Sequence, residues 1–328
     1  MAEVDEFSTR LSKLVERPTY FSGGHRLCAG CNAGVMARLV TMAFTRPTVV
    51  VQATGCLEVA STIYPFTAWK VPWLHCAFEN AAATASGVEA AFYTMQKKGI
   101  RDNDEKIDIV VLGGDGGTYD IGIQSLSGAL ERGHDLLYIC YNNGAYMNTG
   151  IQRSGATPRL ASTTTSPAGS VIPGKMEFPK DLTAIVVAHD SVKFAATTTT
   201  AHSRDLVGKV RTALDVDGPT FLLVDSPCQR GWRFDSSLGL EMNRLAVETC
   251  VFPVYTIDRR GGTEEWKLDT PSRKIARKPE LKKPVEDYMK PQGRFRHIFR
   301  RPDGSELIKQ VQEFYDQKWD DLLVKCGY

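Results

Sequence analysis

The chain has 328 residues, 42% of them hydrophobic and 24% charged, and a formal net charge of +2. This composition is typical of a soluble globular protein with one large domain or two, and a balance so near neutrality disfavours a nucleic-acid partner or a charged membrane surface. No apolar run is long enough to span a membrane, and the acidic first segment does not resemble a signal peptide, so we expect a cytoplasmic protein. In that compartment the eight cysteines favour metal or redox chemistry over disulfides.

The middle of the chain alternates short apolar runs with longer helical patterns. The runs are continuous, rich in β-branched residues and bounded by Gly, Pro, Asp or Asn, as is typical of buried parallel strands. We expect strands at 48–53, 107–114, 135–142, 183–189 and 219–226, with helices at 34–45, 80–98, 120–131 and 203–216. This alternation predicts an α/β fold with a doubly wound, mainly parallel sheet and helices on both faces.

The character of the sequence changes near residue 230, which divides the chain into regions 1–230 and 231–328. Residues 259–297 are charged, punctuated by proline and poor in strand signal, so we expect an extended arm that lies on a surface, namely a partner's. An amphipathic helix near 305–324 is expected to begin at Ser305. Residues 162–179 form a long loop, and long loops inside compact domains are often functional.

The Gly-rich stretch "VLGGDGGTYDIG" (111–122) leaves an expected strand and enters a helical pattern. It matches neither G-x-G-x-x-G nor the P-loop, but its glycines would let the backbone approach a phosphate near a helix N-terminus. A carboxylate beside a phosphate requires a cation between them, so Asp115 is a candidate Mg²⁺ ligand. The alternative is a simple turn in which Asp115 caps the helix.

The next expected strand also ends in polar residues, Asn142 and Asn143. The carboxyl ends of neighbouring parallel strands meet at one edge of a sheet, where α/β folds bind their ligands. Asp115, the Asn143 amide oxygen and a loop carbonyl could therefore meet on one hard cation.

Cys28 and Cys31 form a C-x-x-C pair before an expected helix. A redox dithiol would follow a strand directly, and zinc would require a second such pair, which the sequence lacks. An iron–sulfur cluster would require two further single cysteines, and spacing alone does not select them. Cys56 and Cys228 follow strand ends, Cys140 lies within a strand as a core residue would, and Cys76, Cys250 and Cys326 have no supporting context.

Gly114-Asp115-Gly116, followed by Asn142-Asn143, resembles the thiamine diphosphate/Mg²⁺ signature. Within that superfamily the chain resembles the β subunits of pyruvate:ferredoxin oxidoreductases (pyruvate synthases), of the 2-oxoacid:ferredoxin oxidoreductase family. The matching stretches, which span roughly residues 20–300, are "CAGC", "TGCLEV", "FENAAATASGVEAAF", "GGDGGTYDIG", "NNGAYMNTGIQRSGATP" and "KKPVEDYMKPQGRFRH".

The resemblance implies three cofactors: thiamine diphosphate, Mg²⁺ and one 4Fe–4S cluster. It implies that region 1–230 carries the diphosphate and cluster sites, whereas region 231–328 contacts a partner. Asn148 is implied to lie near the thiazolium and substrate as a catalytic residue, although an Asn can also merely shape a turn. The implied cofactor-binding residues are Thr54, Gly55, Gly114, Asp115, Gly116, Gly117, Asn143, Ala145, Asn148 and Thr149; the implied ligands are Asp115, Asn143 and the Ala145 carbonyl for Mg²⁺, and Cys28, Cys31, Cys56 and Cys228 for the cluster.

The implied reaction is reversible oxidative decarboxylation of pyruvate with coenzyme A to acetyl-CoA and CO₂, with electrons passing singly through the cluster to ferredoxin. The chain has one diphosphate motif, so it would hold half an active site. The implied partners are a chain that supplies the pyrimidine-binding domain and its Glu, a coenzyme A-binding γ subunit and a ferredoxin-like subunit. Alternatives are the same chemistry on oxalate or another 2-oxoacid, a non-redox thiamine decarboxylase or synthase subunit, and a cluster-binding module without catalysis.

Several other residues have weaker functional interpretations. His75 is expected to cap or pack beside a helix, and His25 could hydrogen-bond near the C-x-x-C pair. Arg153 and Lys175, in long loops, are possible contacts for coenzyme A phosphates. The aromatic residues could wall a substrate or a partner contact, but such residues are more often core; they are Tyr64, Phe66, Trp69 and Trp73.

Overall fold

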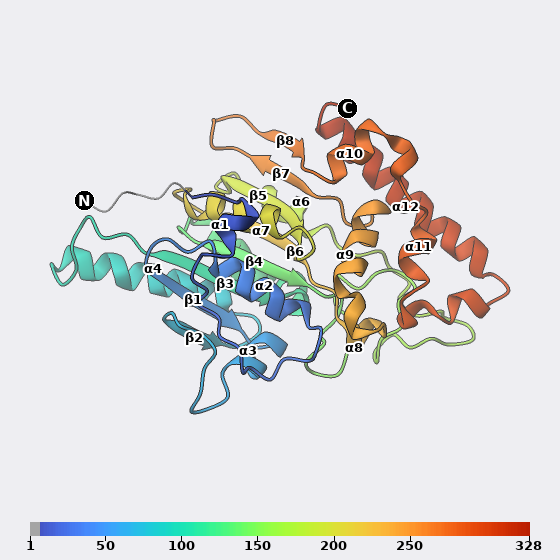
Figure 1. Ribbon diagram of the computed structural model, residues 1–328, viewed down its shortest axis with the longest axis horizontal. Helices are drawn as coiled ribbons and strands as arrows, with labels where there is room; N and C mark the ends of the chain where they lie inside the picture. The colour runs from blue at the N-terminus through green and yellow to red at the C-terminus, as the bar shows by residue number, and fades with distance from the viewer. Residues whose placement is uncertain (1–6) are drawn as a thin grey trace.

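The computed structural model describes residues 7–328 and contains an eight-stranded sheet in the order β2-β1-β3-β4-β6-β5-β7-β8 (Figure 1). Neighbouring strands from β2 to β5 in that order are parallel, and β7 and β8 are antiparallel. The strands are β1 Thr48–Ala53, β2 Trp73–Cys76, β3 Asp108–Gly114, β4 Leu137–Asn142, β5 Phe194–Thr199, β6 Thr220–Asp225, β7 Tyr255–Asp258 and β8 Glu265–Leu268. The predicted mainly parallel sheet is confirmed.

Helices cover both faces of the sheet, as the strand–helix alternation predicts. One apolar core lies under α2 (Asn32–Thr41) and α7 (Ser203–Leu214), and the other under α4 (Ala81–Lys97), α5 (Ile123–Glu131) and α6 (Leu182–Val187). The short helices α1 (Leu11–Leu14) and α3 (Cys56–Ser61) and the π-helix η1 (Gly116–Ile121) complete this part. The fold class predicted from the sequence is therefore correct.

The register of the central strands brings their carboxyl ends to one edge. Gly114, the last residue of β3, is paired with Tyr141, and Asn142, the last residue of β4, is paired with Asp225 at the end of β6. The loops after these strands therefore start side by side, in the position where open α/β sheets bind ligands.

The C-terminal third forms a layer of helices beyond that edge, drawn in orange and red in Figure 1. Its own apolar core includes Trp232, Tyr288, Phe295 and Tyr315. The elements are α8 Gln229–Trp232, α9 Gly239–Glu248, α10 Ser272–Arg277, α11 Val285–Met289 and α12 Gly304–Lys325, with short 3₁₀ turns at Ser236–Leu238, Pro279–Leu281, Gly293–Phe295 and Ile298–Arg300. Within residues 7–328, no helix combines the length and apolarity needed to cross a bilayer.

One predicted strand is wrong: residues 183–189 lie in helix α6. Asp181 caps this helix by accepting a hydrogen bond from the Ala184 amide at 3.0 Å. Leu182 and Val186 are buried against the sheet, whereas Ile185 is 38% exposed, so the apolar run has a helical face rather than two buried strand faces. The actual strand, β5, contains the small residues "FAATTT", which the sequence analysis missed.

The expected extended arm at 259–297 is also wrong. The β7–β8 hairpin precedes α10 and α11, and the apolar residues Ile275, Val285 and Met289 are buried against this same chain rather than on a partner. The final helix was predicted correctly, but it begins at Gly304 and no side chain caps it, so Ser305 is not its cap. The domain division at residue 230 and the partner contact of region 231–328 stay predictions.

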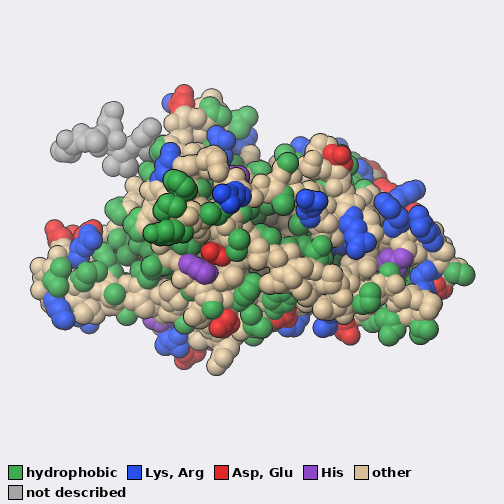
Figure 2. Space-filling view, turned by 90° about the horizontal axis from the view of Figure 1, so that it is seen from below, with side chains coloured by type: hydrophobic (Ala, Val, Ile, Leu, Met, Phe, Trp, Pro, Cys, Tyr) green, Lys and Arg blue, Asp and Glu red, His purple; other side chains and the backbone are tan. Residues whose placement is uncertain are grey.

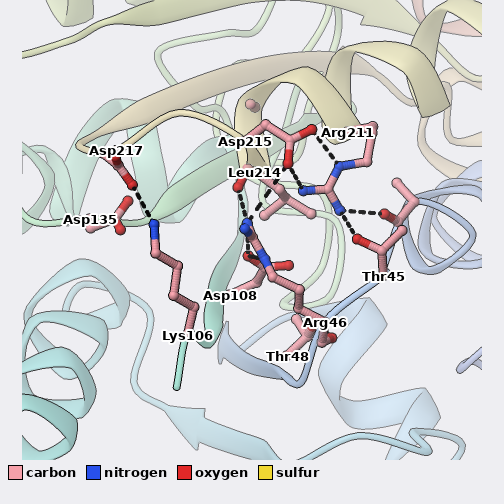
Figure 3. Close-up of polar contacts among 12 residues, drawn as sticks. Thr45, Arg46, Thr48, Lys106, Asp108, Asp135, Arg211, Leu214, Asp215 and Asp217 are labelled. Atoms are coloured by element: carbon pink, nitrogen blue, oxygen red, sulfur yellow. Dashed lines mark hydrogen bonds and ion pairs between the residues drawn. The ribbon is translucent and has the colours of Figure 1, made fainter. Parts of the chain in front are cut away.

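Ion pairs hold the opposite edge of the sheet, where the parallel strands begin (Figure 3). Arg46 lies 2.6 Å from the Asp108 carboxylate at the start of β3 and also donates to the Leu214 carbonyl at the end of α7. Arg211 of the same helix donates from Nε to Asp215 Oδ2 at 2.9 Å. Because Asp108 is buried, removal of Arg46 would leave an uncompensated buried charge, which is strongly destabilising.

A buried carboxyl at the end of β6 makes stability depend on pH. Asp225 is 4% exposed and accepts a hydrogen bond from Asn243 Nδ2 at 2.7 Å. Burial raises the pKa of Asp225 to about 7, so the folded state holds a proton that the unfolded state has already released above pH ~4. We therefore expect the free energy of unfolding to fall between pH 4 and 7 by up to about 1.4 kcal/mol per pH unit through this group.

Asp225→Asn should remove this pH dependence. The free energy of unfolding of the variant, relative to that of the unchanged protein, should therefore rise steadily from pH 4 to 7. Urea unfolding at several pH values measures the effect. Asp258→Asn is the control, because hydrogen bonding and charge from Arg260 lower the pKa of Asp258 and its contribution has the opposite sign. A difference between Asp225→Asn and the unchanged protein that does not vary with pH would contradict the prediction.

Candidate cofactor site

A pocket at the carboxyl edge of the sheet brings the predicted cofactor residues together. Its walls come from the loops that follow β1, β3 and β4, which the parallel register places side by side. Phe78, which precedes α4, closes one side. The predicted residues that line it are Thr54, Gly55, Cys56, Gly114, Asp115, Gly116, Gly117, Asn143, Ala145, Asn148 and Thr149.

The glycines after β3 are required by close packing. A Cβ on Gly116 would overlap the ring of Tyr146, and a Cβ on Gly117 would lie 2.8 Å from the Phe78 carbonyl oxygen. Tyr146 also donates its hydroxyl to the Gly116 carbonyl at 2.8 Å, which ties the β4 loop to the β3 loop. The backbone can therefore approach a ligand closely here, as phosphate binding requires.

Among the described residues that line this pocket, Asp115 is the only acidic one, and it is 1% exposed. It accepts hydrogen bonds from Ser154 Oγ at 2.5 Å and from the Asn143 backbone amide at 3.2 Å. Burial raises the pKa of Asp115 to about 7, against the effect of these two donors. The carboxylate thus lies in a site where a nearby cation would be strongly stabilising.

The side-chain amide of Asn143 points at two further oxygens. In the orientation that satisfies its hydrogen bonds, its nitrogen donates to Asp115 Oδ1 at 2.9 Å and to the Ala145 carbonyl at 2.8 Å. A carboxylate, an amide and a carbonyl therefore converge on one point. Oxygen ligands of these three kinds are the ones that bind Mg²⁺ and Ca²⁺ in proteins.

Asn148 and Thr149 lie on the outer part of the β4 loop. The Asn148 side chain lies near enough to the Cys56 thiol, at the start of α3, to lower its pKa against the larger effect of burial. Thr149 is exposed and donates to Gln152 Oε1 at 2.6 Å. Both residues line the pocket, although only Asn148 contacts a predicted cluster ligand.

Three of the four predicted cluster cysteines stand at helix N-termini. Cys31 precedes α2, Cys56 begins α3, and Cys228 precedes α8, where its sulfur accepts from the Gly231 amide at 3.4 Å. Burial raises the pKa of the Cys56 thiol to about 11, and the charges of Cys228, Cys31 and Cys28 act in the same direction. The four thiols therefore lie near enough to influence one another's ionisation.

Hydrogen bonds from two buried side chains connect the loop of Cys28 and Cys31 to the loop of Cys228. Asn32 donates to the Pro227 carbonyl at 3.0 Å, and Gln229 donates to the Ala29 carbonyl at 2.6 Å. These contacts join segments about 200 residues apart. Across residues 7–328, no three His, Cys, Asp or Glu side chains form a group able to hold one metal ion.

The other cysteines are separated from this group. All eight cysteines are free thiols; Cys140 and Cys250 are buried in the cores, whereas Cys76 and Cys326 are partly exposed. The expectation that Cys140 packs in the core is confirmed.

The observed contacts of two histidines and two loop cations can be compared with the roles that the sequence suggested for them. His75 belongs to strand β2, not to a helix cap, and its Nε2 lies 2.7 Å from Thr54 Oγ1 at the pocket wall. His25 stacks on Phe21, and its Nδ1 has no hydrogen-bond partner within residues 7–328. Lys175 is buried and donates to the Thr157 carbonyl at 2.6 Å, so a phosphate contact by Lys175 is wrong. Arg153 is exposed and pairs with Glu177 at 3.1 Å.

The aromatic series is divided between core and surface. Trp69 is buried against Phe21, and Trp73 donates to Gln52 at 2.9 Å. Tyr64 and Phe66 are 94% and 78% exposed in the loop between α3 and β2. This loop projects at the lower edge of Figure 1, and Figure 2 shows the face on which it lies, where apolar side chains reach solvent.

Sequence reasoning missed three residues of the site. Ser154 reaches Asp115 from 39 positions further along the chain, Tyr146 braces the glycine turn, and Phe78 closes the pocket. Ser154 carried no signal of its own, because a serine in a loop is common. The aromatic residue within the Asn-rich loop, Tyr146, could have been noticed from its position between Asn143 and Asn148.

The fold and this pocket define a class of protein. Residues 53–224 match the thiamine pyrophosphate enzyme C-terminal TPP-binding domain, so the chain is a thiamine diphosphate-binding protein. The chain is 48% identical over 303 residues to the pyruvate synthase subunit PorB of Thermotoga maritima, covering 92% of this chain and 90% of the relative. The corresponding subunit of Methanocaldococcus jannaschii is also 48% identical, over 92% of this chain and 96% of its own.

The chain therefore belongs to the PorB family of thiamine diphosphate-dependent 2-oxoacid:ferredoxin oxidoreductase subunits. A solved 2-oxoglutarate:ferredoxin oxidoreductase from Magnetococcus marinus has the same fold, with a TM-score of 0.52 at 16% identity over 85% of this chain and 92% of that one. The family and fold expected from the sequence are confirmed.

Proposed function

We propose that this chain is the diphosphate-binding subunit of an enzyme that oxidatively decarboxylates pyruvate with coenzyme A, yields acetyl-CoA and CO₂, and passes electrons singly to ferredoxin. The observation that carries the proposal is the convergence of the β1, β3 and β4 loops on one pocket with a single buried carboxylate. The names of the relatives at 48% identity support pyruvate as the substrate.

We assign Mg²⁺ to the oxygens of Asp115, Asn143 and Ala145. The Asp115 carboxylate and the Ala145 carbonyl both lie within hydrogen-bond distance of the Asn143 amide, and rotation of that amide would present its oxygen beside theirs. A bound divalent cation would be held by these three oxygens and would supply positive charge for binding the diphosphate. Ser154 then orients the Asp115 carboxylate through its 2.5 Å hydrogen bond.

We assign one 4Fe–4S cluster to Cys28, Cys31, Cys56 and Cys228. A four-iron cluster holds its thiolates farther apart than a single ion does, so this assignment agrees with the lack of a single-ion group in residues 7–328. The buried hydrogen bonds of Asn32 and Gln229 fix the relative positions of the ligand loops. Burial raises the pKa of the Cys31 and Cys228 thiols, and backbone amides at the starts of α2 and α8 act in the opposite direction by hydrogen-bonding to the sulfurs.

When bound, thiamine diphosphate supplies the carbanion chemistry of decarboxylation, and the cluster supplies a one-electron acceptor. The chain's residues orient these groups. Asn148 and Cys56 both line the cofactor pocket, and the Asn148 side chain lies near enough to the Cys56 thiol to influence its pKa. The proposed cluster ligand Cys56 therefore borders the proposed cofactor pocket.

We expect the isolated chain to be inactive. The proposed site on this chain binds only the diphosphate half of the cofactor. A second chain would supply the pyrimidine-binding domain with its Glu. A γ subunit would bind coenzyme A, and a ferredoxin-like subunit would carry the electrons onward. Size-exclusion chromatography and assays of the chain alone and with its co-expressed partners measure this. Turnover of pyruvate by the lone chain would contradict the half-site proposal.

The substrate is tested on the anaerobically purified complex with a series of 2-oxoacids, coenzyme A and a dye acceptor. We expect pyruvate to have the highest kcat/KM. Preference for oxalate or another 2-oxoacid would keep the chemistry and change the substrate. Decarboxylation without dye reduction, in protein that lacks a dithionite-bleachable visible absorption, would favour the non-redox alternative, and a cluster without bound thiamine diphosphate would favour a non-catalytic cluster-binding module.

A further inference from the structure

A second cavity lies behind the proposed Mg²⁺ loop, between the ends of β4 to β6 and the C-terminal helices. Its volume is about 220 Å³. Asn142 and Gly144 line this cavity, whereas Asn143 and Ala145 line the cofactor pocket, so alternate residues of one loop face two separate spaces. The proposed reaction uses nothing in this second space.

The cavity wall contains a buried arginine without an acidic partner. Arg294 is 2% exposed, and its guanidinium stacks over the Trp232 ring at 3.9 Å. Nε donates to Gln292 Oε1 at 2.8 Å and Nη2 to the Tyr288 hydroxyl at 3.3 Å, whereas Nη1 has no hydrogen-bond acceptor in the described chain. No carboxylate in residues 7–328 lies within ion-pair distance of its guanidinium, although the charge of Asp225 acts on it from farther away.

The acidic side chain of Asp225 also lies in the cavity wall, but it makes its hydrogen bond with a different residue. Its carboxyl is bound by Asn243 rather than by Arg294. Burial raises the pKa of Asp225 and lowers that of Arg294, and the attraction between the two groups opposes both shifts. Because burial penalises the guanidinium charge and no carboxylate in residues 7–328 is in direct contact with it, an anion that enters the cavity would be stabilised there.

The remaining walls favour an organic anion over an inorganic one. Trp232, Phe252, Tyr288 and Tyr315 present aromatic surface to the cavity. Of the three lysines that line the cavity, Lys180 lies 2.8 Å from Asp120 and Lys318 lies 3.3 Å from Asp181, whereas Lys325 stacks over the Trp266 ring. One guanidinium with a fork geometry suits a single carboxylate, whereas a phosphate dianion would require further donors. Figure 2 shows Lys and Arg side chains gathered at the end of the molecule that holds the C-terminal helices, which would attract an anion.

We propose that this cavity binds a small organic monocarboxylate, whose carboxylate pairs with Arg294 and whose apolar part packs against the aromatic walls. A volume of about 220 Å³ holds roughly seven waters at ~30 Å³ each, which suits a ligand of the size of benzoate rather than a nucleotide or coenzyme. The site is separate from the cofactor pocket, and it does not depend on the proposed reaction.

The test is a titration of the purified complex with sodium benzoate, acetate, pyruvate and phosphate at constant ionic strength, followed by calorimetry. We expect saturable binding of one benzoate per chain, weaker binding of acetate, and the weakest binding of phosphate. Arg294→Met should weaken benzoate binding at least tenfold. Val251→Phe, which fills the cavity and leaves the guanidinium in place, should do the same, and it serves as the test if Arg294→Met does not fold.

Arg296→Met is the matched control, because Arg296 is an exposed guanidinium two residues away; it should bind benzoate unchanged. Binding is also measured in Asp115→Ala, in which the proposed cofactor site is damaged; retained benzoate affinity there separates this inference from the proposed function. Lack of saturable benzoate binding, equal binding by Val251→Phe, or tighter binding of phosphate than of benzoate would overturn the proposal.

Discussion

Asp115→Ala is expected to abolish Mg²⁺-dependent retention of thiamine diphosphate and, with it, all 2-oxoacid turnover. Asp115 is the only acidic side chain among the described residues that line the pocket, and without it the proposed Mg²⁺ site would lose its one negatively charged ligand. Changes to residues that merely support a metal ligand cost 10–100-fold in affinity, so loss of the ligand should cost at least about 100-fold. Equilibrium dialysis of thiamine diphosphate with and without Mg²⁺ measures it.

Two further variants separate charge from packing. Asp115→Asn keeps the volume and removes the charge, and it should lose nearly as much affinity. Ser154→Ala removes only the 2.5 Å hydrogen bond that orients the carboxylate, so its loss should be smaller, of order tenfold. Asp190→Ala, at an exposed position, is the control. The iron content should be unchanged in all four proteins, and normal cofactor content in Asp115→Ala would contradict the proposed role.

Replacing any one of Cys28, Cys31, Cys56 or Cys228 with serine is expected to eliminate or convert the cluster and stop electron transfer to the acceptor. A 4Fe–4S cluster requires four thiolates, so each ligand matters equally. Iron analysis and EPR spectra of the reduced, anaerobically purified complex measure the result. Thiamine diphosphate should still bind, because the proposed Mg²⁺ ligands lie on other loops.

Alanine at Cys76, Cys140, Cys250 and Cys326 is the matched control set. These changes remove one sulfur's packing, on the order of 1 kcal/mol for a buried thiol, and should leave the EPR signal intact. A normal signal in Cys228→Ser combined with loss in Cys76→Ala or Cys250→Ala would show that the fourth ligand is misassigned.

The strands at the centre of the sheet were predictable because their signal is local. Residues 48–53 and 108–114 are continuous runs rich in β-branched residues, which are typical of a strand buried on both faces. The exchange of strand and helix near 183–199 shows where this signal fails. "TAIVVAH" is as apolar as a strand, but the Asp181 cap and one exposed face make it helical, whereas the Thr-rich β5 is a strand because packing between β6 and β7 buries it.

The C-terminal region shows the same limit at larger scale. Its charged, proline-punctuated sequence lacks regular periodicity, which predicted an arm. Tertiary packing instead buries its scattered apolar residues in a third core against α8, α9 and α12. Periodicity identifies an element that contacts one partner surface; it cannot detect short helices whose few buried residues each contact a different segment.

The sequence by itself determined the class of the sheet, the glycine turn that carries Asp115, and the loops that end beside it, because each depends on residues within one strand and its following turn. Only the tertiary structure decided that Ser154 reaches Asp115, that Asn148 reaches Cys56, and that Gln229 and Asn32 join the Cys28–Cys31 loop to Cys228. The reason is physical: contacts between residues 39 to 200 positions apart arise from how the strand ends and helices pack together, and no local pattern encodes the distance between them.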